Sequence, residues 1–303
     1  MPRSDTTLGS VLNGLMIRYQ QRVPDVAGIL HDMVNEKIIN DPSEIENDHI
    51  AFRTIGVNYL GIQSLEKIFL HYGYKRMDHY SFPEKKLDAY WFLPANEKDP
   101  RIFISELRVQ DLPEVTRNLI MSYTSEVESD PVDLLDLDNT VQVDEFLHSS
   151  LWRLPSWKDY RALAAVSEYA AWTIYNRYYL NHFTISVHNL KEGYNTIKSF
   201  NDFLEKKNYV LNNSSGKIKE SPDGGLLQSA TVAQMTEAAF ADGDTHIIPG
   251  SYVEFAERRI LPLYSQLPLA EIKRTHRREG FEAANADKIF ESTYATQTGR
   301  VNK

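Results

Sequence analysis

The chain has 303 residues, of which 42% are hydrophobic and 25% charged, as is typical of a globular enzyme with a sizeable core. Its formal net charge of −9 argues against a general binder of nucleic acid or anionic membranes, because neither polyanion attracts an acidic protein. It contains no cysteine, so disulfides and thiolate chemistry are excluded and a metal must be bound by His, Asp or Glu. No apolar run predicts a signal peptide or a membrane span, and we therefore expect a cytoplasmic protein.

The hydrophobic periodicity divides the chain into five successive parts. The pattern predicts N-terminal helices in residues 1–45 and a first β-α-β-β-β module in residues 46–111, whose leading strand begins at His49. Residues 112–179 predict a helical insertion, which is acidic at 126–145 and aromatic-rich further on. The earlier order returns in a second module at 180–260, and a C-terminal helical segment follows at 261–303. The expected strands of the second module are 182–188, 209–211, 216–220, 225–232 and 251–258.

The repetition of this order predicts the architecture. Phe69 lies 20 residues after His49, and Phe203 lies 21 residues after His182. Each half therefore begins with a histidine on its first strand and continues into a helix at the same distance. A curved β-α-β-β-β half leaves one face open, and repeats indicate a fold when one unit cannot bury its own face. We expect an α+β fold in which two such modules pair to form a curved sheet around a cavity.

Strand alternation places three possible metal ligands on the cavity side. Alternate side chains of a strand share a face, so His49 and His182 each oppose apolar neighbours that point towards covering helices. Glu254 has the same relation to Val253 and Phe255 in the last strand. Two imidazoles and one carboxylate that leave open positions are the pattern of non-haem iron(II) oxygenases. Arg53, on the same face as His49, has the length and charge to bind a substrate carboxylate.

Each of these residues also has a plainer interpretation. A strand histidine is usually a packed or half-exposed side chain, and Arg53 alone is more often a salt-bridge residue. Glu257 is a rival to Glu254, and Glu106 holds what looks like the corresponding place in the first module. His188 and His246 are possible accessory groups around the metal.

The segment Asp48-His49-Ile50-Ala51-Phe52-Arg53-Thr54, together with His182 and Glu254, resembles the 2-oxoadipate dioxygenase/decarboxylases, or hydroxyglutarate synthases, of the vicinal-oxygen-chelate (glyoxalase-like) superfamily. The resemblance runs from about residue 10 to residue 295. The C-terminal part, Tyr252–Arg258 and Gly280–Asn285, is more distantly similar to the end of 4-hydroxyphenylpyruvate dioxygenases, where the first glutamate of the strand binds iron and the next helix closes the site. That similarity favours Glu254 over Glu257.

The resemblance implies Fe(II) held by His49, His182 and Glu254, with Arg53 on the substrate and Gln228 and Ser229 as further contacts. The implied reaction uses O2 to decarboxylate and hydroxylate a 2-oxo dicarboxylic acid, 2-oxoadipate, to 2-hydroxyglutarate and carbon dioxide. The same fold also serves glyoxalase-like lyases or isomerases, ring-cleaving dioxygenases and non-catalytic ligand-binding proteins. Anaerobic activity with another metal would indicate a lyase, and absence of metal and of oxygen consumption would indicate a binding protein.

Overall fold

The computed structural model of the chain describes residues 7–299. The N-terminal helices are α1 and α2, separated at Val23 because Pro24 lacks the N–H that would continue the first helix. The first module follows, and then a helical insertion. The bounds up to this point are α1 Thr7–Arg22, α2 Pro24–Asn35, β1 Asn47–Ile55, α3 Ile62–His71, β2 Lys75–Phe82, β3 Leu87–Leu93, β4 Arg101–Leu107, α4 Glu114–Thr124, α5 Thr140–Phe146, α6 Trp157–Ala164 and α7 Glu168–Asn176.

The second module begins after α7 and leads to the C-terminal helices. Its bounds are β5 His182–Ser186, α8 Ile197–Lys206, β6 Lys219–Glu220, β7 Leu226–Ala230, β8 Met235–Ala239, β9 Thr245–Pro249 and β10 Tyr252–Arg258, followed by α9 Ala283–Phe290 and α10 Ala295–Thr298.

The described residues form an eight-stranded sheet in the order β2-β3-β4-β1-β5-β10-β7-β6. The order of the first half mirrors that of the second, with β1 beside β4 and β5 beside β10, both pairs parallel. The halves join through antiparallel pairing of β1 with β5. The expected α+β fold of two paired β-α-β-β-β modules is therefore confirmed.

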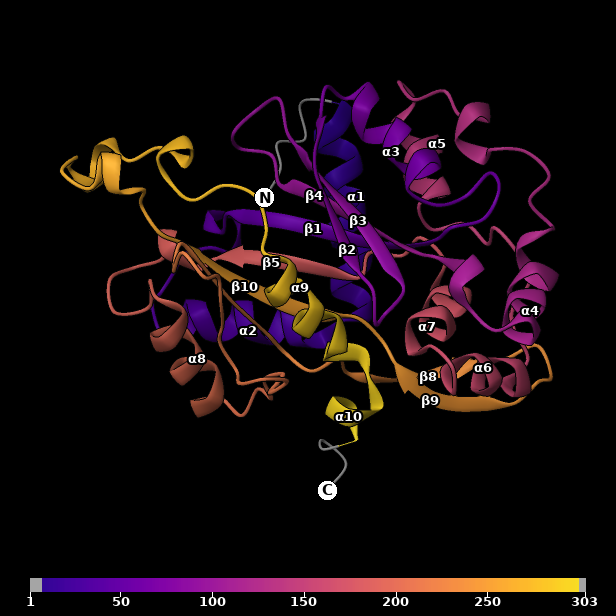
Figure 1. Cartoon of the computed structure of the whole chain (residues 1–303). Coiled ribbons are helices and arrows are strands. Elements are labelled where there is room, and N and C mark those ends of the chain that lie inside the picture. Colours follow the sequence, from indigo (N-terminus) through magenta and orange to yellow (C-terminus); the bar gives the residue numbers. More distant parts are fainter. Residues whose placement is uncertain (1–6, 300–303) are drawn as a thin grey trace.

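The second module differs from the expected order of strands. Residues 209–211 form no strand, and only Leu211 makes an isolated bridge, to Thr231. The sequence pattern did not predict the two-stranded hairpin β8–β9, which forms a separate small sheet near α6 and α7 (Figure 1). The hairpin interrupts the module between β7 and β10 without changing their pairing.

The two faces of the sheet have different partners. Apolar side chains point to the outer helices, as shown by the ring contacts of Phe52 with Phe69 of α3 (5.6 Å) and of Phe255 with Phe200 of α8 (5.1 Å). The opposite face carries the polar residues of β1, β5 and β10 and is covered by α9, which crosses in front of β5 and β10 in Figure 1. The curled sheet and α9 thus enclose the space where the modules meet.

Candidate metal centre

Three central strands each contribute one potential metal ligand. His49 on β1, His182 on β5 and Glu254 on β10 each offer a ligand atom, and these atoms lie within 4.8 Å of one another. The Nε2 atom of His182 is 3.0 Å from Oε2 of Glu254, and the Nε2 atom of His49 is 3.5 Å from Oε1. All three residues are at most 5% exposed. The cluster is buried and compact enough for one ion.

Strand register explains why residues so far apart in the chain converge. β1 and β5 pair antiparallel with His49 opposite Thr184, and β5 and β10 pair parallel with Thr184 beside Glu254. His182 lies two residues from Thr184 and therefore on the same face of the sheet, beside Tyr252 of β10. A shift of one residue in either pairing would turn a ligand towards the outer helices.

Neighbouring polar residues orient both imidazoles. The Nδ1 atom of His49 is 2.8 Å from Asp48, and that of His182 is 3.1 Å from Oδ1 of Asn181. When these partners accept a hydrogen bond from Nδ1–H, each Nε2 lone pair is directed at the shared centre. Neither partner was predicted as a functional residue, although each directly precedes its histidine in the chain.

The charges of the cluster are those of a cation site. Burial alone would raise the pKa of Glu254, but the two imidazoles hold it far below its usual value. Burial lowers the pKa of His182. For His49 burial acts in the same direction, yet the carboxylates of Glu254 and Asp48 outweigh it and raise the pKa. The carboxylate is therefore ionised and available as a ligand at neutral pH.

A buried ion-pair network holds Asp48, the residue that bonds to His49. Both oxygens of Asp48 accept hydrogen bonds from Arg258, at 2.7 and 2.9 Å, and Arg101 donates to the same carboxylate at 3.2 Å. Arg101 also pairs with Glu279, and Arg258 donates to the carbonyl of Gly280. The network ties His49 to the segment that leads into α9.

The two rival glutamates have a structural role. Glu257 accepts a hydrogen bond from the first backbone N–H of α8, at Ile197, and Glu106 accepts the corresponding bond from Ile62 of α3. They are equivalent helix caps of the two modules. By strand register the counterpart of Glu254 in the first module is Phe103, so Glu106 does not hold the corresponding place.

Of the two further substrate contacts expected, the structure brings only one to the metal cluster. Gln228 donates to Glu254 at 2.6 Å and accepts from Asn285 of α9 at 3.1 Å, which links a ligand to the covering helix. Ser229 points the other way and donates to Asn201 of α8. Adjacent residues of a strand face opposite sides, so at most one could have reached the site.

The two histidines considered as accessory groups lie outside the cluster. β5 ends at Ser186, and His188 lies in a short 3-10 helix where its Nδ1 atom accepts from the backbone of Arg258 at 3.2 Å. Burial lowers the pKa of His188 to about 3, so it is neutral at physiological pH. His246 lies on β9 and stacks on Trp157 at 3.9 Å. The strand expected to run to residue 188 was thus too long.

Arg53 is 1% exposed and has no carboxylate within ion-pair distance among residues 7–299. Its guanidinium donates to Oγ1 of Thr293 and to the carbonyl of Phe290, both at 3.0 Å. The rings of Tyr169, Trp172 and Phe290 surround it at 5.0–5.8 Å. A buried cation usually has an anionic partner, and Arg53 has none among these residues.

The space beside the metal cluster is closed. Its cavity measures about 20 Å³ and is bounded on the cover side by Phe281 and by Ala286, Ile289 and Phe290 of α9. Phe281 packs edge-on against His49 at 4.8 Å. A volume of this size holds roughly one water molecule, so a larger ligand requires these residues to move.

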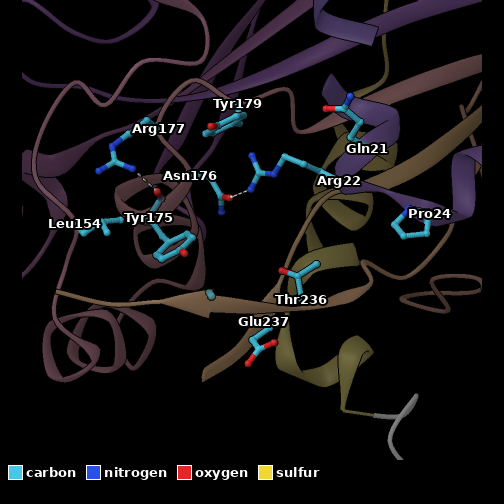
Figure 2. A pocket seen from close by; sticks show the side chains of 11 residues that line it. Gln21, Arg22, Pro24, Leu154, Tyr175, Asn176, Arg177, Tyr179, Thr236 and Glu237 are labelled. Carbon is cyan, nitrogen blue, oxygen red and sulfur yellow. Dashed lines mark hydrogen bonds between the residues drawn. The ribbon is translucent and has the colours of Figure 1, made fainter. Parts of the chain in front are cut away.

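Larger hollows lie elsewhere in the described chain. Figure 2 shows one of about 600 Å³ between α1, α7 and β8, and none of its lining residues belongs to the metal cluster. Its two arginines sit at helix ends, Arg22 as the last residue of α1 and Arg177 as the residue after α7, where cations complement the helix dipoles. This hollow therefore needs no ligand to explain its charge.

The family model for 2-oxoadipate dioxygenase/decarboxylase matches residues 11–273. The chain belongs to this family. A curated relative, the chloroplastic 2-oxoadipate dioxygenase/decarboxylase of Arabidopsis thaliana, is 45% identical over 96% of this chain and 78% of its own length. The crystal structure of the Oryza sativa hydroxyglutarate synthase in complex with 2-oxoadipate is 40% identical, with a TM-score of 0.87 over 96% of this chain and 93% of that one. The expected membership in a family of dioxygenase/decarboxylase enzymes is confirmed.

A more distant solved structure has a similar fold. It is a Ralstonia eutropha JMP134 protein described as of the glyoxalase superfamily, with a TM-score of 0.70 over 93% of this chain and 90% of that one. At 17% identity the likeness concerns the fold alone.

The expectation of a cytoplasmic protein is contradicted, since the Arabidopsis relative is a chloroplastic enzyme. The expectation rested on composition and on the lack of a long apolar run, and neither property reports the organelle in which a protein folds. Within residues 7–299, no helix has the length and apolar character needed to cross a membrane.

Proposed function

We propose that this protein is an iron(II)-dependent oxygenase that converts 2-oxoadipate and O2 into 2-hydroxyglutarate and carbon dioxide. The observation that carries the proposal is the buried cluster of His49, His182 and Glu254 in a chain of the 2-oxoadipate dioxygenase/decarboxylase family. The reaction balances, since one oxygen atom of O2 enters the new carboxylate and the other enters the hydroxyl group beside it.

The donor set fits iron(II). Two neutral imidazoles and one carboxylate are the ligands of non-haem iron oxygenases, and the absence of cysteine removes the softer ligands that favour zinc or copper. When bound, iron(II) would supply the activation of O2 for oxidation of the 2-oxo acid. The protein supports this with Asp48 and Asn181, which hold the imidazoles in the tautomer that leaves Nε2 free.

Arg53 would bind the far end of the substrate. Its guanidinium is buried among aromatic rings and has no carboxylate partner among the described residues, so the distal carboxylate of a dicarboxylic acid would complete its shell. The 2-oxo acid end would then lie at the metal. Binding at both ends fixes the reacting carbons, and such positioning supplies much of the advantage of an enzyme.

The closed cavity implies that the substrate enters when the Phe281–Phe290 segment moves aside. When the segment returns, Phe281 and Ile289 cover the metal cluster and exclude bulk water. Exclusion of water protects a reactive oxidant and strengthens the contacts of Arg53 with its partner. The contact of Asn285 with Gln228 would hold the closed position.

The test is oxygen uptake by the iron-loaded protein with 2-oxoadipate, together with detection of 2-hydroxyglutarate. His182→Ala removes one ligand and should reduce the rate by more than about 100-fold, since loss of even a partner of a ligand costs roughly 10- to 100-fold. His148→Ala is a matched control, because His148 is a partly buried histidine outside the metal cluster whose ring nitrogen bonds to Asp144. Full activity of His182→Ala would refute the proposed centre.

A further inference from the structure

Two buried polar atoms at one end of the candidate site lack a hydrogen bond of good geometry within residues 7–299. They are Nε of Arg53 and the hydroxyl oxygen of Tyr252, whose side chains lie close enough to interact with each other. Tyr252 is fully buried and Arg53 is 1% exposed. Buried polar groups are almost always paired, so two neighbouring exceptions indicate a missing common partner.

Strand register places both atoms on the same side of the metal cluster. On neighbouring strands His49 lies level with Glu254, and His182 lies level with Tyr252 two residues further along the sheet. Arg53 lies a further two residues along β1 in the same direction. Tyr252 lies two residues from Glu254, roughly 7 Å along the strand. A substrate that chelates the metal and extends in this direction passes Tyr252 before it reaches Arg53.

The Tyr252 ring lines the cavity and cannot easily turn away. It packs against the His182 ring at 4.9 Å, and it bounds the same cavity as the three candidate ligands. A tyrosine hydroxyl carries a proton that it can donate to a carboxylate.

We infer that Tyr252 and Arg53 together form the receptor for the distal carboxylate of the substrate and set the chain length that the site accepts. This inference rests on the proposed function and adds a specificity residue to it. The tyrosine O–H and the arginine Nε–H each donate to the carboxylate, and the surrounding rings hold the guanidinium plane in place. A methyl group at that end of the substrate would leave both donors unpaired, which is how such sites reject apolar analogues.

The inference predicts an effect on substrate choice with Tyr252→Phe. The variant removes a single hydroxyl group, so 2-oxoadipate should bind about 10- to 100-fold more weakly, the usual effect of one hydrogen bond to a charged group. Binding of 2-oxohexanoate, which has a methyl group in place of the distal carboxylate, should change by less than about twofold because that molecule offers the hydroxyl no acceptor. Calorimetric titration of anaerobic protein loaded with Mn(II) measures both affinities without turnover.

Stability separates this role from a structural one. Removal of an unpaired buried hydroxyl should leave the ligand-free melting temperature of Tyr252→Phe unchanged or higher, whereas loss of a structural hydrogen bond would lower it. Tyr178→Phe is the matched control for substrate choice, since Tyr178 is also a buried tyrosine and lies outside the cavity. The control should keep the wild-type preference for 2-oxoadipate.

The outcomes distinguish the inference from the proposed function. If the wild type prefers 2-oxoadipate and Tyr252→Phe keeps that preference, the inference is wrong and the proposed function stands. If Tyr252→Phe loses the preference while the iron-loaded wild type consumes no oxygen, the receptor is correct and the reaction is wrong. If the wild type binds both acids equally, the receptor is overturned, whatever the oxygen assay gives.

Discussion

Replacement of Asp48 by Asn should destabilise the protein strongly, although it changes only one group. Asp48, Arg258 and Arg101 are each at most 2% exposed, and the carboxylate accepts three short hydrogen bonds from the two guanidiniums. An amide would leave Arg258 without its ion-pair partner and Arg101 with Glu279 alone, and would direct an N–H group at one of the guanidiniums. Removal of one partner from a buried pair costs about 3–5 kcal/mol. Arg258 keeps its bonds to backbone carbonyls and Arg101 keeps Glu279, so we expect a value near 3 kcal/mol, at the lower end of that range.

The assay is urea unfolding of chelator-treated protein at pH 7, which removes the metal from the comparison. Asp202→Asn is the control, because its ion pair with Lys198 at 3.1 Å is exposed and should contribute less than about 0.5 kcal/mol. Equal losses in the two variants would refute the reasoning.

The pH dependence of the Asp48 effect has a definite sign. Burial by itself would raise the pKa of Asp48, but Arg258 and Arg101 hold it well below its usual value. A depressed folded pKa stabilises the native state at all pH values above the unfolded pKa of about 4, and this contribution is lost as the pH falls further. The difference between wild type and Asp48→Asn should therefore be constant from pH 6 to 8 and shrink below about pH 4.

Three further changes test other parts of the structure. Phe281→Ala removes the ring that covers His49 and should cost about 3 kcal/mol of unfolding free energy, with faster proteolysis of the segment before α9. Burial raises the pKa of Asp25 to about 6, so the native state loses stability as the pH rises from about 4 to above 6. Asp25→Asn should therefore raise the stability at pH 7.5 and leave it unchanged at pH 4, and a pH series of thermal melts measures the difference. Metal removal should lower the melting temperature of the wild type and leave that of His182→Ala unchanged, since a ligand bound only by the native state stabilises it.

The residues that form the centre could be read largely from local pattern. Alternation along a strand has a period of two, so the sequence alone placed His49, His182 and Glu254 on faces opposite their apolar neighbours. The repeated order of strand and helix then predicted two modules, and hydrophobic periodicity predicted the N-terminal helices. These are short-range properties that each segment carries by itself.

Tertiary structure decided what depends on pairing between distant segments. Register made Phe103 the counterpart of Glu254 and left Glu106 and Glu257 as matching helix caps, an assignment that spacing within one strand cannot give. Asp48 contacts Arg258, 210 residues away, only after the modules pair. The same pairing brings Arg53 and Tyr252 to the same side of the metal cluster. Sequence periodicity sets which face a side chain occupies, whereas the identity of its neighbours depends on how the strands align.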